Sequence, residues 1–267
     1  MAPDSDAPND ARSLEVIVAG LPRTGTTSMT RALEILLKKR VFDGGHVSWY
    51  GTIEQQKLLL DLSMRCPIRT STDRKIVLHA LKELTTGYVA TSDQPGCYFL
   101  EELLELYPTA KVVVSIRDPN SWWESYCALW NSIALLYLWS ILDPFSRLRR
   151  FCVFSVKFWD RVPQAVDLPG TRPWWPLSNH DGLYEAHAEY VQRVVPKDQL
   201  FYVDVKDGWA PLCQILQVDE PKGEPFPHVF PRRWLEEGVQ KEKSRLQRRL
   251  ATILIFLTVV AGVCLYR

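Results

Sequence analysis

A short glycine-bearing loop joins the first apolar run of the chain to a segment with helical periodicity. Leu14 to Ala19 is apolar and β-branched, which predicts a buried strand, and Thr27 to Lys39 has apolar residues at helical spacing, which predicts a helix. The loop between them, from Gly20 to Thr27, reads GLPRTGTT. In such a unit the N–H groups of the loop and of the helix N-terminus converge on an anion. The sequence therefore predicts a phosphate-binding loop.

This loop differs from that of an ordinary nucleotide hydrolase. Its glycines keep the G-x-x-x-x-G spacing, but Thr26 stands at the lysine position and the positive charge is at Arg23 instead. A magnesium-dependent hydrolase also needs an acidic residue after a neighbouring strand, whereas the apolar run Lys111 to Ile116 is followed by Arg117. Both differences favour metal-free recognition of a phosphorylated nucleotide. We expect no metal site.

Strand-like and helix-like runs alternate along the chain. Strands are expected at residues 14–19, 88–91, 111–116 and 200–205, and helices at 27–39, 100–107, 121–137, 183–195 and 211–216. The continuous apolar run KVVVSI is typical of a strand inside a parallel sheet. We therefore expect an α/β fold, a P-loop three-layer sandwich with a central parallel sheet, spanning residues 14–235 after a disordered leader at 1–13.

Charge and cysteine content argue against a nucleic-acid-binding protein, a zinc protein and a disulfide-stabilised protein. Lys and Arg number 32 against 31 Asp and Glu, for a net charge of +1, which lacks the basic excess of a nucleic-acid-binding surface. The six cysteines are scattered, without Cys-x-x-Cys or paired histidine spacing. Neither a zinc site nor a disulfide framework is expected.

The C-terminal segment is uncharged and apolar from Leu250 to Tyr266, over 17 residues, which is the short limit for a bilayer span. A basic stretch precedes it, and residues 236–249 are expected to form a juxtamembrane helix. Because positive charge stays on the cytosolic side, we expect a single-pass transmembrane tail anchor at 250–266 and a cytosolic catalytic domain. So short a span suits the thin membrane of the endoplasmic reticulum. The alternative is a helix buried in the domain.

The middle of the chain is rich in tryptophan and holds a second apolar run, Ala128 to Leu142. That run is too short to span a membrane and predicts a buried or interfacial helix. The aromatic residues have two interpretations, as core and interface residues or as the wall of an apolar substrate pocket. The following segment, Phe145 to Trp159, sets arginines beside aromatics and could lie on a lipid surface.

Two motifs and their surroundings resemble the sulfotransferases. The loop PRTGTTSM is similar to their 5′-phosphosulfate loop, P-K-S-G-T-T, and VVVSIRDPNSWWES is similar to their 3′-phosphate motif, in which a serine follows an arginine by eight residues. With ATSDQPGCYFLEELLELYP, LYEAHAEYVQRVVPKDQLFYVDVKDGWAPLCQIL and PFPHVF, the likeness runs from about Val16 to Phe230. The whole set resembles the P-loop sulfotransferase-like family that is frequent in fungi.

The resemblance implies that the chain binds PAPS, the sulfuryl donor 3′-phosphoadenosine 5′-phosphosulfate. The residues implied around the 5′-phosphosulfate are Arg23, Thr24, Gly25, Thr26 and Thr27, and those on the 3′-phosphate are Arg117 and Ser125. Arg23 would also supply positive charge as the nucleotide leaves, since charge builds on the bridging oxygen. Many members carry lysine there, and arginine is larger and keeps its proton.

Two residues are candidates for the base that removes a proton from the acceptor. Many sulfotransferases use a histidine after an early strand, and His46, in FDGGHVSWY, occupies that part of the chain. Asp93 follows the expected strand at 88–91, where family members also carry an acidic residue. His46 could instead be a structural histidine, and Asp93 could orient substrate or cap a helix near Cys97.

Three functions are compatible with these observations. The first is transfer of a sulfuryl group from PAPS to a hydroxyl or amine of a lipophilic small molecule. The second is a repurposed enzyme of the same fold that catalyses a non-sulfating step of natural-product biosynthesis, since a fold does not determine chemistry. The third is a non-catalytic, nucleotide-binding membrane adaptor. A GTPase or kinase would need the lysine and the metal-binding carboxylate that the loop lacks.

Overall fold

A five-stranded parallel sheet forms the centre of the computed structural model, which describes residues 14–141, 147–158, 160–167 and 182–229 and isolated positions after 239. The strand order is β2-β3-β1-β4-β5. All four strand pairs are parallel. The strands are β1 (Val16–Val18), β2 (Val41–Asp43), β3 (Ala90–Ser92), β4 (Lys111–Ile116) and β5 (Leu200–Asp204). The predicted central parallel sheet is confirmed, with β2 as a strand that the sequence reading did not include.

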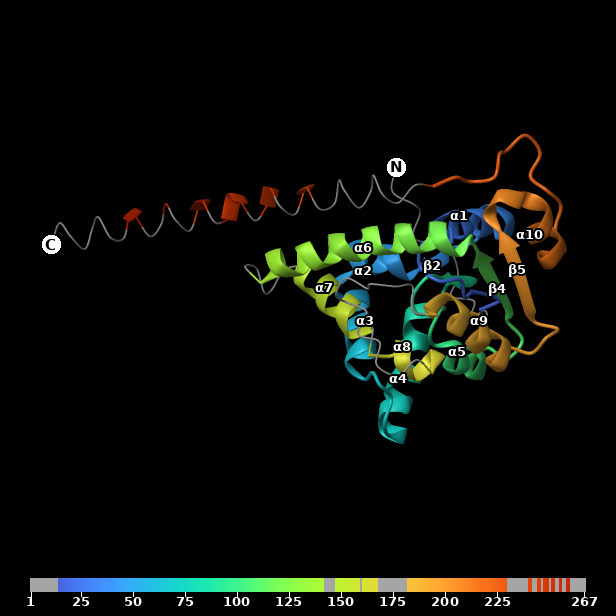
Figure 1. Ribbon diagram of the computed structural model, residues 1–267, viewed down its shortest axis with the longest axis horizontal. Helices are drawn as coiled ribbons and strands as arrows, with labels where there is room; N and C mark the ends of the chain where they lie inside the picture. Colours follow the sequence, from blue (N-terminus) through green and yellow to red (C-terminus); the bar gives the residue numbers. More distant parts are fainter. Residues whose placement is uncertain are drawn as a thin grey trace.

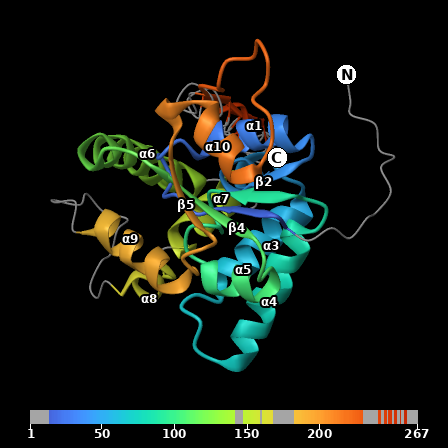
Figure 2. The same ribbon diagram turned by 90° about the vertical axis from the view of Figure 1, so that its right-hand side faces the viewer.

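Helices cover both faces of this sheet, as Figure 2 shows. On one face α1 (Thr26–Leu37) and α10 (Trp209–Leu216) pack against the strands. The other face is covered by a larger set, most of which lies below the sheet in the view of Figure 1. That set includes α3 (Ile53–Met64), α4 (Ser71–Thr85), α5 (Leu100–Leu106), α6 (Pro119–Ser140), α8 (Val162–Val166) and α9 (Leu183–Val194). The three-layer arrangement follows the sequence expectation.

Alternation along the short strands explains how one sheet serves two cores. Successive side chains of a strand point to opposite faces. In β1, Val16 and Val18 pack with α1 and α10, while Ile17 packs in the core beneath the opposite helices. All three are fully enclosed. Since both faces are covered, β1 is apolar throughout, which is why it reads as a continuous apolar run.

Several helices lie where the sequence reading left the chain unassigned. These are α2 (Gly44–Tyr50), α3, α4, α7 (Arg147–Phe158) and α8. Two of them carry sequence signals for a helix start: Thr52 and Gln55 form a reciprocal capping box at α3, and Thr70 and Asp73 form another at α4. The short α2 begins at two glycines, which have low helix propensity and hide it from a pattern search.

The aromatic middle of the chain divides between core and pocket. Trp122, on α6, is fully buried, and its indole N–H donates to the carbonyl of Pro22 at 2.9 Å. Trp49 of α2 packs edge-on against Phe151 of α7, with ring centroids 4.5 Å apart. Helix α7, whose segment could have lain on a lipid surface, makes this contact and packs along α3 and α6. Residues 174 and 175 lie outside the described part of the chain.

The prediction of a transmembrane tail anchor at 250–266 is wrong. Within the described residues, no helix is both long and apolar enough to cross a membrane. The membrane partner and the endoplasmic-reticulum location inferred from that anchor are corrected with it. The expectation depended on an uncharged run at the lower length limit, and lack of charge alone does not make a helix of spanning length. Most of 250–266, and the leader at 1–13, lie outside the described residues.

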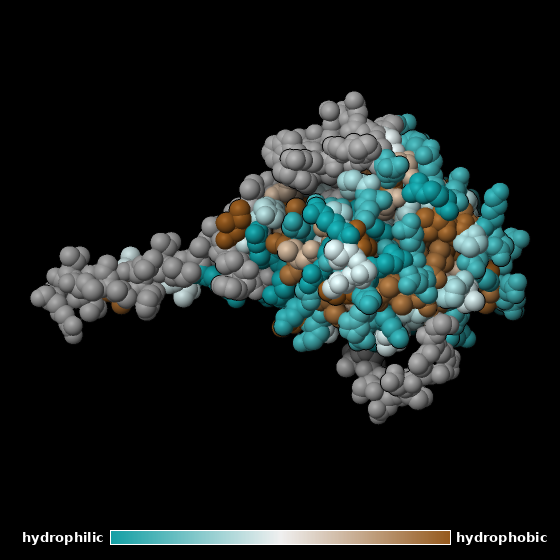
Figure 3. All heavy atoms as spheres, turned by 90° about the horizontal axis from the view of Figure 1, so that it is seen from below, coloured by the Kyte–Doolittle hydropathy of each residue, from teal (hydrophilic) through white to brown (hydrophobic). Residues whose placement is uncertain are grey.

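One face of the molecule carries both hydrophobic and hydrophilic side chains on its surface. On the face shown in Figure 3, hydrophobic residues occur in small groups separated by hydrophilic ones. Beneath the surface, a buried ion pair joins α5 to the start of α8. Arg161 is 2% exposed and donates to Glu102 at 2.9 Å. Because breaking such a pair leaves a buried charge without compensation, it ties the helical layer together.

Candidate functional site

A cavity of about 460 Å³ lies at the carboxyl ends of the sheet strands. The segments that follow all five strands contribute to its wall, as do α6, α7 and the C-terminal segment around residues 228–229. Strands β2 and β3 lie on one side of β1, and β4 and β5 lie on the other. Ligands of open α/β sheets bind in this position, where the strand order reverses.

The loop after β1 is held against the sheet by its own side chains. Thr24 is buried, and its hydroxyl donates to the carbonyl of Leu21 at 2.7 Å and lies 2.6 Å from the hydroxyl of Ser115 on β4. Gly20 packs so closely on Ser115 that a side chain there would overlap it. Thr24, predicted to contact the nucleotide, thus lines the cavity, but its hydroxyl is hydrogen-bonded to Leu21 and Ser115 and holds the loop in place. Because these contacts hold the loop in place, its amides are oriented before an anion binds.

Gly25 gives this loop its turn into α1. Its φ of 99° is in the left-handed region, which glycine adopts without a steric penalty. A β-carbon at Gly25 would lie 2.8 Å from a methyl group of Val205, just after β5. Helix α1 begins at Thr26 with no side-chain cap. Its first N–H groups are therefore available to a ligand, and both Thr26 and Thr27 line the cavity.

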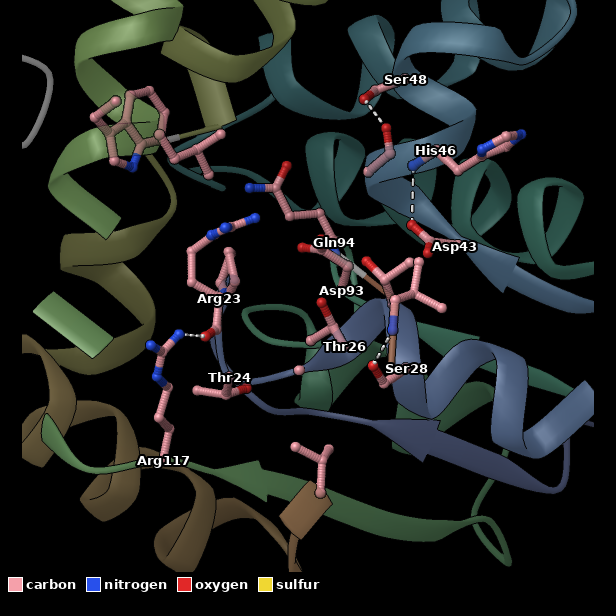
Figure 4. Close-up of a pocket in the computed structure, with 18 of the residues that line it drawn as sticks. Arg23, Thr24, Thr26, Ser28, Asp43, His46, Ser48, Asp93, Gln94 and Arg117 are labelled. Atoms are coloured by element: carbon pink, nitrogen blue, oxygen red, sulfur yellow. Dashed lines mark hydrogen bonds between the residues drawn. The ribbon is translucent and has the colours of Figure 1, made fainter. Parts of the chain in front are cut away.

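The two predicted phosphate subsites form one hydrogen-bonded network. The Nε of Arg23 donates to the Ser125 hydroxyl on α6 at 3.0 Å. Arg117, after β4, donates from Nη1 to the Arg23 carbonyl at 3.1 Å, a contact drawn in Figure 4. The structure therefore brings together Arg23, Arg117 and Ser125, as the sequence motifs require. Lys206, after β5, also lines the cavity and adds a third cation.

The opposite side of the cavity carries two carboxyl groups. Asp43 ends β2, and Asp93 follows β3 with a φ of 61°. A β-carbon at Gly45 would lie 2.9 Å from Asp93 Oδ2 and 3.3 Å from Asp43 Oδ1, so both groups approach the same point. Burial, and then the negative charge of Asp43, raise the pKa of Asp93 to about 7, against the opposing effects of the Gln94 amide and Arg23. Asp93 can therefore exchange a proton at neutral pH.

His46, the other candidate base, has a different placement. It is exposed at the edge of the cavity, and Figure 4 shows its imidazole directed away from Asp93 and Arg23. Its ring lies 5.2 Å from that of Tyr50, between ring centroids. Its backbone N–H donates to Asp43 Oδ1 at 2.9 Å. In this structure His46 helps to begin α2, and Asp93 is the candidate base nearer the phosphate loop.

An apolar wall completes the cavity. It is formed by α6 and α7 and consists of Leu129, Trp130, Ile133, Phe151 and Phe154. Ile133 and Phe151 belong to a small cluster behind this wall, together with Trp49. The cavity thus has three regions: a basic one at the phosphate loop, an acidic one at the two carboxyl groups, and an apolar one at α6 and α7. Such a lining suits a ligand with an anionic part and a hydrophobic part.

Asp43 is the site residue that the sequence reading missed. It precedes the two glycines before His46, so it belongs to a motif that the sequence reading singled out. The short run VF before it was not recognised as a strand, because two apolar residues are too few for a periodicity. The rule that polar residues gather at the carboxyl ends of parallel strands would have found it, once β2 was assigned.

Fold and site together define a P-loop protein of an unusual kind. Its loop carries Arg23 in place of the usual lysine, and Arg117 follows β4 where a nucleotide hydrolase has an acidic residue. The chain belongs to the sulfotransferase family, whose domain model matches residues 15–233. It is also similar to a fungal protein, the Ava biosynthesis cluster protein M of Aspergillus versicolor. The two are 30% identical over 218 residues, which cover 81% of this chain and 80% of the relative.

Proposed function

We propose that this protein transfers a sulfuryl group from PAPS to a hydroxyl or amine of a lipophilic small molecule. The observation that carries the proposal is the network in which Arg23, Arg117 and Ser125 meet at the phosphate loop. Family membership supports a transferase with a small-molecule acceptor. The apolar wall of α6 and α7 supports the lipophilic character of that acceptor.

The donor set of the cavity fits a nucleotide with two anionic ends. The uncapped start of α1 offers N–H groups to the 5′-phosphosulfate, and a side chain at Gly25 would crowd the loop against Val205. Arg23 and Lys206 provide positive charge beside it. Arg117 has further guanidinium N–H groups besides the one that contacts Arg23, and a planar guanidinium suits bidentate binding of the 3′-phosphate.

The chemistry of the transfer needs two kinds of assistance from the chain. Negative charge develops on the leaving phosphate oxygen, where loop amides and Arg23 stabilise it. The acceptor loses a proton as its oxygen or nitrogen attacks sulfur, and we assign the role of receiving that proton to Asp93, which lines the cavity. A pKa near 7 makes Asp93 an effective acceptor at neutral pH.

Binding of PAP, the desulfated nucleotide product, tests the first half of this proposal. The full chain should show a higher unfolding temperature with PAP, since a ligand that binds only the folded state stabilises it. Adenosine without phosphates is the matched control and should have a much smaller effect. Absence of a PAP shift, with Arg117→Ala behaving as the wild type, would refute the proposal. Mass spectrometry after incubation with PAPS and a host extract should then reveal a product heavier by one sulfuryl group.

A repurposed enzyme of the same fold is the second candidate. It is favoured by the near-neutral pKa of Asp93, because one carboxyl present in both forms can give or take a proton without any sulfuryl donor. The relative's name, which refers to a biosynthesis cluster, is consistent with such a step. Turnover of a host metabolite at an equal rate with and without PAPS would select this candidate over the first.

A further inference from the structure

We propose that Asp43 is a positioning residue that forms a carboxyl pair with Asp93, and that the pair holds one proton between them when the site is ready to bind its acceptor. Release of that proton leaves Asp93 as the group that takes the acceptor's proton. The catalytic part of this inference rests on the proposed function. The pairing itself rests on the structure alone.

The first argument is the position of the two groups. They follow adjacent parallel strands, and Asp43 is paired in register with Ser92, the residue before Asp93. Gly44 cannot hold a side chain, because its β-carbon would fall 1.3 Å from the carbonyl oxygen of Gln94. The backbone after β2 therefore lies directly against the backbone after β3. This contact fixes the separation of the two carboxyl groups across Gly45.

The second argument is that the two carboxyl groups have different hydrogen-bond partners. Asp43 accepts at Oδ1 from the N–H of His46 at 2.9 Å. Its Oδ2 lies 3.2 Å from the hydroxyl of Thr30, whose single proton it shares with the Thr26 carbonyl at 3.0 Å. Asp93 accepts at Oδ1 from the N–H of Gln94, at 2.8 Å. Among the described residues, none donates a hydrogen bond to the other oxygen of Asp93, Oδ2. Hydrogen bonds stabilise the ionised form, so Asp43 keeps its charge more readily and the proton resides on Asp93.

Burial gives the pair a net tendency to hold a proton, and the nearby positive charges oppose that tendency. Burial raises the pKa of Asp43 as well as that of Asp93. The hydrogen bond and charge of His46, from α2, oppose the rise at Asp43, and Arg23, from the phosphate loop, opposes it at Asp93. The other titratable groups facing Asp93 are Cys97, Tyr98 and Tyr126. Burial raises the pKa of all three, so they are neutral at physiological pH. Two carboxylates that share a site cannot both ionise freely, and one pKa is raised.

In the proposed transfer each bond that forms is matched by a bond that breaks. With Asp93 ionised, the acceptor O–H or N–H bond breaks, and its proton moves to Asp93 Oδ2. The acceptor atom forms a bond to sulfur, and the bond from sulfur to the nucleotide phosphate oxygen breaks, so that PAP carries away the electron pair. Asp93 then returns its proton to solvent. Asp43 does not contact the reacting atoms in this scheme; its charge makes Asp93 a stronger base.

Carbon-13 NMR of protein labelled at the aspartate carboxyl carbons tests the pairing without reference to activity. In the wild type, one carboxyl should titrate near pH 7, and this signal should be missing in Asp93→Asn. In Asp43→Asn, which retains a side-chain oxygen for the N–H of His46, the titration of Asp93 should move down by about one pH unit or more. The control Asp61→Asn removes one negative charge at an exposed position on α3 and should leave it unchanged.

Unchanged titration of Asp93 in Asp43→Asn, or an equal shift in Asp61→Asn, would overturn the pairing. If Asp43→Asn does not fold, the reciprocal measurement serves, because coupling acts equally in both directions. Asp93→Asn should then lower the titration midpoint of Asp43, and no change there would also overturn it. The pH profile of kcat/KM gives the catalytic readout, and its rise should move to lower pH in Asp43→Asn. A chain that neither binds PAP nor sulfates refutes the proposed function, while the NMR result still decides the pairing.

Discussion

Arg117 and Arg23, which lie 94 positions apart in the sequence, are joined by a hydrogen bond of 3.1 Å from the guanidinium of the first to the carbonyl of the second. Arg23 has a φ of 78°, a conformation that residues other than glycine adopt at a cost. The contact with Arg117 helps to hold the loop in this conformation. Arg117 thus supports the phosphate loop as well as offering charge to a ligand.

Replacing Arg117 with alanine should weaken PAP binding by about 10- to 150-fold. A hydrogen bond to a charged group contributes about 1.5–3 kcal/mol, and each 1.4 kcal/mol is about tenfold in affinity. Arg117→Lys keeps the charge but loses the planar fork, and should recover only part of the affinity. Titration calorimetry with PAP measures both. Arg69→Ala, at an exposed position before α4, is the control, and equal affinity of all variants would contradict the assignment of Arg117.

Gly25→Ala should damage the phosphate loop more than a comparable change elsewhere. Gly25 and Gly87 both have positive φ, at 99° and 81°, so alanine strains the backbone at either position by about 1–2 kcal/mol. Only at Gly25 does the new methyl group meet a neighbour, Val205, whereas nothing lies within 4 Å at Gly87. Thermal unfolding and PAP binding compare the two variants. Similar PAP affinities in both would show that Gly25 has no special role in binding.

Ser28→Ala should release the C-terminal segment that reaches the cavity. The Ser28 hydroxyl, on α1, accepts a hydrogen bond from the Val229 N–H at 3.1 Å, shown in Figure 4. Its loss should cost about 0.5–1.5 kcal/mol locally. Amide hydrogen exchange at Val229 should become faster by roughly threefold to tenfold, while exchange within β4 stays unchanged. Equal acceleration in both places would indicate general destabilisation instead.

Asp93 should make the protein less stable as the pH rises. Its folded pKa of about 7 lies above the ordinary value of 3.8, so the folded state binds the proton more tightly than the unfolded state. The stabilisation is complete below about pH 4 and is lost as the pH rises toward 7, at about 1.4 kcal/mol per pH unit in that window. Asp93→Asn is neutral at every pH, and asparagine tolerates the left-handed conformation found there.

Urea unfolding of the wild type and of Asp93→Asn between pH 4 and 8 measures this effect. The variant should gain stability relative to the wild type as the pH rises, and the gain should level off above pH 7. Asp61→Asn again serves as the control for a change of net charge. A difference between variant and wild type that does not depend on pH would mean that the pKa of Asp93 is not raised.

The sequence motifs point to the residues of the basic side of the cavity more directly than to those of its acidic corner. The residues of the basic side belong to short motifs that directly follow strands with a clear apolar pattern. The glycine-bearing loop follows β1, and Arg117 and Ser125 follow β4. Asp43 depends on β2, whose three residues carry little pattern, and on backbone contact between Gly44 and Gln94, which no local signal reveals. His46 has the residue type of a base, but the orientation of its side chain depends on α2, a helix that begins with two glycines.

The tail shows a different kind of error. An uncharged run of 17 residues after a basic stretch has the composition of a membrane span, and the prediction rests on that composition and on the position of the positive charges. The pattern says which residues would tolerate lipid, but it does not establish a continuous helix of spanning length. The aromatic middle of the chain was more informative, because its two interpretations both describe part of what α6 does.

The order of strands divides the tasks of the cavity between two flanks. Segments after β1, β4 and β5 carry the cations, with Asp204 at the end of β5 beside them, while Asp43 and Asp93 lie where β2 and β3 end, and α6 and α7 shape the apolar wall. On the proposed function, substitutions of Asp43 or Asp93 on the second flank would alter the acceptor side of the site and leave the loop after β1, proposed to bind the nucleotide, unchanged.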